Sequence, residues 1–171
     1  MSAHDQNKLE MILRECGIHA RRLEHARGVC DPWFPLNGVS YSNLTDDQIA
    51  HVDQLIYRFT KLQDALGAKL FPLIAGHLRE DADTMTVIDK LAQLERAHAI
   101  EDAERWQELQ ELRNQLAHDY EDDAENAAAY LNDLFAASAS LLAYQKQAAQ
   151  FTQERITTRV SAELPEEVDG F

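Results

Sequence analysis

The sequence predicts an all-α protein, a single domain built as a bundle of four to five antiparallel helices. Apolar residues recur at three- and four-residue steps through most of the 171-residue chain, which places them on one face of a helix. No segment alternates with the period of two typical of a strand, apart from very short pieces of a proline-rich loop. At this length one domain can bury a sizeable core, whereas two domains would each have too little.

The first two helices are expected on either side of the proline-rich loop. The first spans about 5–27 and is broken by Gly28 and the turn-rich segment that follows it. The second begins at Thr45, because Gln48 stands three positions later and completes a capping-box pattern. Pro72 is expected to end or kink this helix, since proline lacks the backbone N–H that a helix interior needs.

Three further helices complete the expected bundle. Thr84 is expected to cap the third, the fourth runs from about Asp102 towards Tyr120, and the fifth covers about 124–153. We assign residues 4–155 to the bundle and 156–171 to an acidic C-terminal tail.

Composition narrows the class of protein. Apolar residues make up 45% and charged residues 27% of the chain, as in globular proteins, and no apolar stretch approaches the ~20 residues of a membrane helix. The N-terminal segment lacks the pattern of a secretion signal, so we expect a cytoplasmic protein without a membrane partner. Cys16 and Cys30 lack metal-knuckle spacing and are expected to be reduced thiols, with Cys16 in the core.

The charge balance bears on possible partners. With 30 acidic and 16 basic residues the formal net charge is −14, which repels nucleic acid and anionic membranes at long range. A basic partner, or a cleft that is basic only locally, fits this balance better.

Arg113 is the most informative position. Leu109, Arg113, Leu116 and Tyr120 advance by four, three and four residues, so the guanidinium interrupts an apolar seam. Burying it unpaired would be very costly, so it must meet an anion, a carboxylate or a water-filled cleft. An intramolecular salt bridge is one explanation. His118 at a helix end and Tyr120 as a packed aromatic likewise have purely structural explanations.

The combination of these residues is more specific than each alone. Arg113 is followed by four residues, then His118, one residue and Tyr120. This pattern resembles the signature of the HEPN superfamily, and more closely that of its HepT-type toxins, in which a polar residue follows the arginine. Here the polar residue is Asn114. HEPN domains are helical bundles of about this size with the motif late in the chain, and the resemblance extends over about 5–153.

The resemblance implies a function. HEPN proteins of this type are typically metal-independent endoribonucleases without a cofactor, and a homodimer forms the cleft. By this resemblance His118 exchanges a proton with the ribose 2′-hydroxyl or the leaving oxygen, Arg113 holds the phosphate, and Asn114 orients the imidazole or binds the phosphate. In the HepT branch a nucleotidyltransferase antitoxin binds the toxin and transfers adenylate from ATP onto the motif tyrosine, here Tyr120.

Helix geometry sets a condition on that mechanism. On a regular helix the side chains of Arg113 and His118 point about 140° apart. Both therefore reach one phosphate only if the helix ends or bends near His118, or if a second subunit closes the gap. This condition favours a homodimer.

Two other classes of function stay open. The acidic charge is compatible with a non-catalytic helical docking subunit, for example the substrate-binding partner of a nucleotidyltransferase. A di-metal bundle would use pairs such as Glu95 and His98, but the sequence holds no second Glu-x-x-His, so no metal site is expected. The remaining candidate ligands are spread over separate helices and are expected at surface or boundary positions: His19, His25, His51 and His77.

Overall fold

A computed structural model describes residues 3–116 and 123–157, and every regular element within these ranges is helical. The expected all-α class is therefore confirmed. Among these residues, no helix combines the length and the apolar character needed to cross a membrane.

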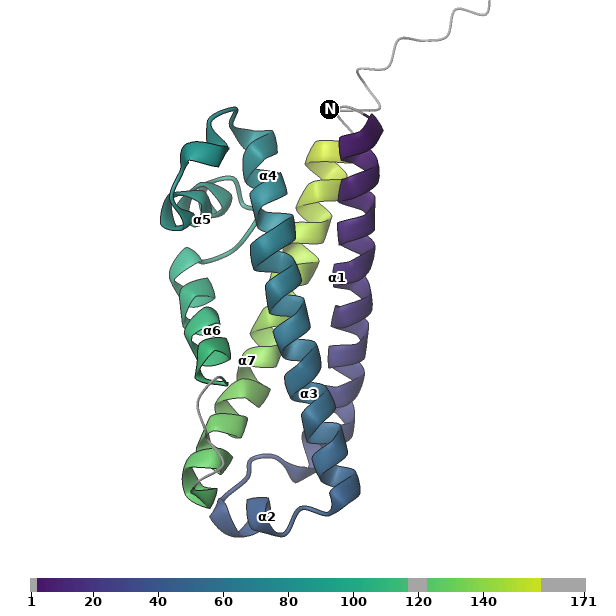
Figure 1. Cartoon of the computed structure of the whole chain (residues 1–171), viewed down its shortest axis with the longest axis vertical. Helices are drawn as coiled ribbons and strands as arrows, with labels where there is room; N and C mark the ends of the chain where they lie inside the picture. Colours follow the sequence, from purple (N-terminus) through teal and green to yellow (C-terminus); the bar gives the residue numbers. More distant parts are fainter. Residues whose placement is uncertain (1–2, 117–122, 158–171) are drawn as a thin grey trace, which may run out of the picture.

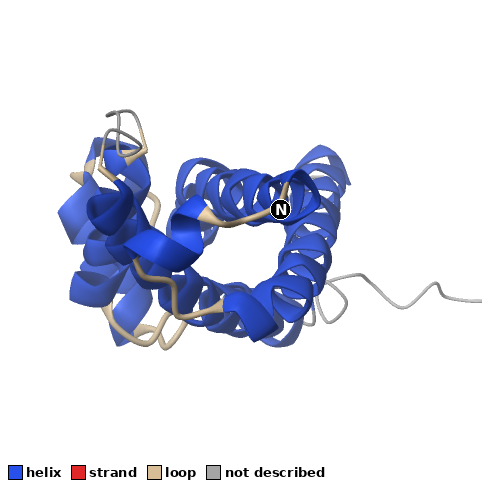
Figure 2. Cartoon of the chain, turned by 90° about the horizontal axis from the view of Figure 1, so that it is seen from below, coloured by secondary structure: helices blue, strands red, loops and turns tan. Residues whose placement is uncertain are grey.

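Three long helices form the body of the bundle (Figure 1): α1 (Ala3–Cys30), α3 (Asp46–Ala65) and α7 (Ala124–Phe151). The first runs antiparallel to the other two and packs against both, most extensively along α3. Seen end-on, the helices surround a common interior (Figure 2). Apolar side chains at helical spacing fill that interior, and among those fully buried are Leu23, Leu55, Phe59, Leu62, Leu131 and Leu134.

Helix α3 begins as the sequence predicts. The Thr45 hydroxyl accepts a hydrogen bond from the Gln48 backbone N–H, and the Gln48 side chain accepts one from the Thr45 N–H. The helical backbone continues past Pro72. A π-helical turn over Leu66–Leu70 precedes it, and α4 (Phe71–Leu78) continues the helix. The wider turn leaves room for the proline ring and tolerates its missing N–H, which explains the difference from a simple helix end.

The start of the next helix corrects the prediction for Thr84. Helix α5 (Val87–Arg96) is capped by Thr86, whose hydroxyl accepts from the Asp89 N–H and donates to the Asp89 carboxylate. Thr84 instead closes a 3-10 turn by donating to the Asp81 carbonyl. The acidic partner three positions downstream selects Thr86 as the cap.

Helix α1 also departs from its expected end. It continues through Gly28 to Cys30, because a glycine near a helix end costs only ~1 kcal/mol and Cys30 is fully buried. A 3-10 turn over Asp31–Trp33 follows. The proline-rich loop then contains a short helix that the sequence reading missed, α2 (Gly38–Ser42).

The C-terminal half adds α6 to this body and contains α7, which is part of it. Helix α6 (Ala103–Gln115) begins where the sequence predicts, with Asp102 as its N-cap, but it ends at Gln115, and residues 117–122 lie outside the described part. Helix α7 passes into a π-helical segment over Thr152–Thr157, and Ile156 is buried in the core. The described helical segment thus runs to Thr157, the last described residue.

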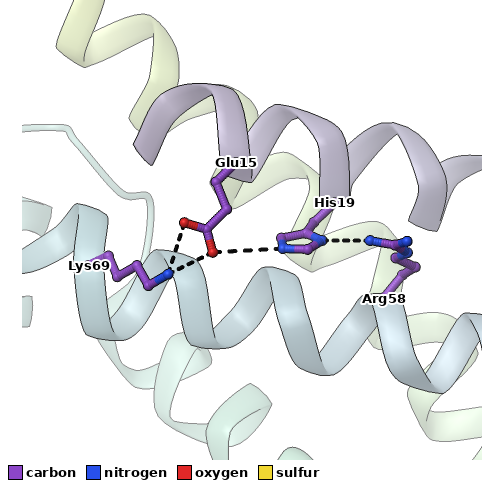
Figure 3. Close-up of polar contacts among 4 residues, drawn as sticks. All are labelled: Glu15, His19, Arg58 and Lys69. Atoms are coloured by element: carbon purple, nitrogen blue, oxygen red, sulfur yellow. Dashed lines mark hydrogen bonds and ion pairs between the residues drawn. The ribbon is translucent and has the colours of Figure 1, made fainter. Parts of the chain in front are cut away.

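A polar network joins α1 to α3 and to the π-helical turn that follows it (Figure 3). The Lys69 ammonium lies 2.7 Å from one Glu15 carboxylate oxygen, and that oxygen lies 3.8 Å from His19 Nε2. On the other side of the imidazole, Arg58 Nη1 lies 2.9 Å from His19 Nδ1. Because a guanidinium can only donate, Nδ1 accepts and the ring is neutral with its proton on Nε2. Burial, and then the Arg58 charge, lower the pKa of His19 below 6.5.

We predict that acidification destabilises the fold in part through His19. Its pKa is lower in the folded state than the ordinary 6.5, so the unfolded chain takes up the proton first as the pH falls. The stabilising contribution of neutral His19 is complete above about 6.5 and is lost as the pH falls through the folded-state pKa. Urea unfolding at about pH 8 and about pH 5 should show a smaller fall in the free energy of unfolding for His19→Gln than for wild type.

The exposed His25 on the same helix provides a matched control. His25→Gln should keep the wild-type pH dependence. An unchanged pH dependence in His19→Gln would contradict the prediction.

Candidate functional site

The candidate site is built on α6, which is held firmly along its length. At its start, the Asp102 carboxylate accepts hydrogen bonds from the backbone N–H groups of Glu104 and Arg105. In its middle, Trp106 and Leu109 are buried. The last turn, which carries Arg113, is tied to α7.

A hydrogen bond connects this last turn of α6 to α7. The Tyr130 hydroxyl donates to the Leu112 carbonyl at 2.9 Å. Because a C-terminal carbonyl of a helix lacks an intrahelical donor, the bond satisfies an atom that would otherwise need water. The neighbouring residue Arg113 is thereby attached to a fixed backbone.

A cavity of about 340 Å³ lies beside Arg113. On one side it is lined by α3, the π-helical turn and α4, and on the other by α5 and α6. Its apolar part consists of side chains from α4, α5, α6 and the π-helical turn. Phe71 and Trp106 meet edge to face with ring centroids 4.6 Å apart. Leu91 and Leu94 of α5 also line it. Its polar lining consists of Gln63, Asp64, Lys90, Gln110, Arg113 and Asn114.

Among the described residues, Arg113 has one ion-pair partner, Asp64. Arg113 Nη2 donates to Asp64 Oδ2 at 3.2 Å, and the two side chains are 36% and 48% exposed. A pair this exposed contributes only about 0–1 kcal/mol to stability. The buried Nε atom of Arg113 has no hydrogen-bond partner. The guanidinium is therefore only partly satisfied, and a stronger anion can compete with Asp64 for it.

Gln63 is a second under-satisfied group on the same cavity. Its side chain is 3% exposed, and its carbonyl oxygen is buried without a hydrogen-bond partner. An unpaired buried acceptor costs about 1–3 kcal/mol. Such a cost is expected where a ligand, and not the fold alone, completes the hydrogen bonding.

The described residues include only the first part of the predicted motif. Arg113 lies at the cavity and meets both a carboxylate and a cleft, as its place in an apolar seam required. Asn114 lines the same cavity with an exposed side chain. His118 and Tyr120 lie outside the described residues. Helix α6 ends at Gln115, between the arginine and the histidine.

Sequence reasoning missed Gln63, Asp64 and Lys90. Gln63 could have been found from the sequence. It follows Leu62 and is a polar residue at a core position, on a part of α3 whose other buried residues are apolar. Asp64 could not, because its pairing with Arg113 joins positions 49 residues apart and depends on how α6 packs against α3.

The other chemical groups of the described chain do not form a site. Burial raises the pKa of Cys16 to about 12 and that of Cys30 to about 11, so both remain thiols near neutral pH. The Glu95 carboxylate accepts from the Ala103 N–H, and His98 occupies a left-handed turn with φ 62°. Within residues 3–116 and 123–157, no cluster of three or more histidine, cysteine or acidic side chains has the arrangement of a metal site.

Comparison with other proteins adds no assignment. The chain matches no family model, and neither the curated proteins nor the solved structures contain a significant match to it.

Proposed function

We propose that this chain is a HepT-like endoribonuclease of the HEPN type, the toxin of a toxin–antitoxin pair, which cuts RNA without a metal ion. The observation that supports this proposal best is the position of Arg113. Its guanidinium lies at the edge of a cavity, held by one weak ion pair and with an unpartnered Nε. These are the properties of a cation that can take up a phosphate.

Local charge supports phosphate binding despite the acidic chain. Among the described residues, the charged side chains that line the cavity are two cations, Lys90 and Arg113, and one anion, Asp64. A phosphate can accept two parallel hydrogen bonds from a guanidinium, and such bonds are stronger than the single contact to an exposed carboxylate. In the proposed mechanism phosphate displaces Asp64.

The catalytic proton transfer is assigned to His118. Imidazole titrates near neutral pH, so it can take a proton from the ribose 2′-hydroxyl and return one to the leaving oxygen. The end of α6 at Gln115 supports this assignment, because the offset of about 140° applies only to one continuous helix. A homodimer that brings a second subunit to the cleft completes the proposed site, with Asn114 beside the phosphate.

Regulation is assigned to Tyr120. A partner of the nucleotidyltransferase type would transfer adenylate from ATP onto its phenol, forming a phosphodiester bond and releasing pyrophosphate. Tyr120 belongs to the same motif as Arg113. In this scheme the added phosphate would bind the Arg113 guanidinium, which the substrate needs. In this scheme modification inactivates the nuclease.

One observation favours a docking function instead. Val87 and Ile88 open α5 beside the cavity, and each is 65% exposed. Adjacent exposed aliphatic side chains are typical of protein contacts. In the alternative, the chain is a non-catalytic subunit that binds a nucleotidyltransferase through this surface.

The first prediction from the proposed function concerns RNA cleavage. Arg113→Ala and His118→Ala should each lower the rate of RNA cleavage by about a hundredfold or more, through loss of charge stabilisation and of proton transfer. Arg105→Ala is the matched control, because it removes the same charge from an exposed site on the same helix. Cleavage is followed on a labelled single-stranded RNA in the presence of a metal chelator. Equal rates for wild type and both motif variants would exclude the catalytic roles.

The second prediction concerns Asp64. Asp64→Asn should tighten RNA binding several-fold with little change in stability, because it frees Arg113 from a pair worth about 0–1 kcal/mol. Asp53→Asn, on an exposed position of the same helix, changes the net charge equally and should have a much smaller effect. Fluorescence anisotropy of a labelled RNA measures both affinities. Weaker binding by Asp64→Asn than by Asp53→Asn would count against phosphate binding at Arg113.

The third prediction concerns Tyr120. After incubation with ATP and a nucleotidyltransferase encoded beside this chain, the intact mass should rise by one or more adenylates and the cleavage rate should fall. Tyr120→Phe should keep its mass and its activity. Modification of both proteins to the same extent would place the acceptor elsewhere, whereas a stable unmodified complex without any RNA cleavage would favour the docking function.

A further inference from the structure

We infer that the cavity beside Arg113 is a nucleobase subsite, and that it selects a base carrying an exocyclic amine. The base would belong to the nucleotide whose phosphate Arg113 binds, so the inference rests on the proposed function for the phosphate half alone. The walls of the cavity, the unpartnered oxygen of Gln63 and the cations at the rim each fit one part of such a nucleotide.

The walls fit a flat apolar ring. The volume of about 340 Å³ lies at the lower end of the range for small-molecule sites, and most of the lining is apolar. Trp106 and Phe71 supply aromatic surface, while Leu91 and Leu94 supply aliphatic surface from the facing helix. Stacking on aromatic side chains is a main source of affinity in single-stranded nucleic acid complexes, and it tolerates every base because each has a π-face.

Close packing keeps this aromatic surface in place. A Cβ atom added to Gly67 would lie 3.1 Å from Cζ2 of Trp106, so the indole rests directly on the backbone of the π-helical turn. On its other side the indole meets Tyr144 edge to face, with ring centroids 5.4 Å apart. The Tyr144 hydroxyl in turn donates to the Asp102 carbonyl. A wall fixed on both sides loses little side-chain freedom when a ligand binds.

Gln63 supplies the selectivity. Its carbonyl oxygen has no partner, so a ligand group that satisfies it must donate a hydrogen bond. The exocyclic amine of adenine is such a donor, once the amide turns toward the ring. An amine-bearing base therefore gains a hydrogen bond that no described residue provides to this oxygen.

The rim of the cavity fits the phosphate. Lys90 and Arg113 line the same cavity as Gln63, so one nucleotide can place its base inside and its phosphate at the edge. The cavity between α6 and α7 has the opposite character. Its lining includes Glu95, Glu101 and Asp102, and these acids disfavour a phosphate there.

Adenosine and purine riboside make a matched pair of probes, because they differ only in the exocyclic amine and carry no phosphate. Trp33→Phe leaves Trp106 as the only tryptophan, so the emission of Trp106 reports binding at the cavity. We expect adenosine to change that emission saturably. Purine riboside should bind about fivefold more weakly, the equilibrium equivalent of one neutral hydrogen bond.

Variants of the lining test the assignment. Gln63→Leu should abolish the difference between the two nucleosides while raising the melting temperature, because it removes the unpaired acceptor. Ala68→Leu should block binding by filling the cavity from an exposed position, whereas Ala50→Leu, exposed on α3 away from the cavity, should bind as wild type.

The outcomes separate this inference from the proposed nuclease. Absence of saturable adenosine binding, or equal affinity for the two nucleosides in the protein that retains Gln63, overturns the base subsite even if RNA is cut at Arg113. Adenosine binding that depends on Gln63 supports the subsite even if no RNA is cut. Adenosine binding that Ala68→Leu leaves unchanged places the ligand elsewhere and overturns the inference.

Discussion

The arrangement of the candidate site depends on one constraint, the need of the Arg113 guanidinium for an anion. The arginine emerges from a helix whose neighbouring turn is anchored by Trp106 and Leu109, so it cannot move far from the cavity. Asp64 meets the need only in part, through one oxygen at 3.2 Å on a half-exposed pair. The cation is thus retained near apolar walls at little gain in stability, which is easier to explain by ligand binding than by folding.

The acidity of the chain affects this site less than the net charge suggests. Charges more than about 8 Å apart are largely screened at physiological ionic strength, so most of the acidic residues act weakly at the cavity. Among the described residues, the charged side chains that line the cavity are those of Lys90, Arg113 and Asp64. The surplus of negative charge therefore slows the approach of RNA without deciding whether a phosphate can bind.

The sequence predicted what local rules decide. Helical spacing predicted the class, and the capping pattern at Thr45 predicted the start of α3, because a cap depends on neighbours within three residues. It failed where two local signals compete, as between Thr84 and Thr86, and where a helix continues past a breaker, as α1 does at Gly28. Of the candidate site it found Arg113 and Asn114, but not Asp64 or Lys90, whose place at the cavity depends on how separate helices pack.

The distribution of unsatisfied atoms carries the functional argument furthest. Folded proteins pair nearly all buried polar groups, since each unpaired one costs about 1–3 kcal/mol. In the described chain four buried side-chain atoms have no partner, and two of these, Gln63 Oε1 and Arg113 Nε, belong to residues that line one cavity. One is an acceptor and the other a donor on a cation. A nucleotide can satisfy both, through an amine on its base and an oxygen of its phosphate, and in doing so it would recover stability that the empty fold lacks.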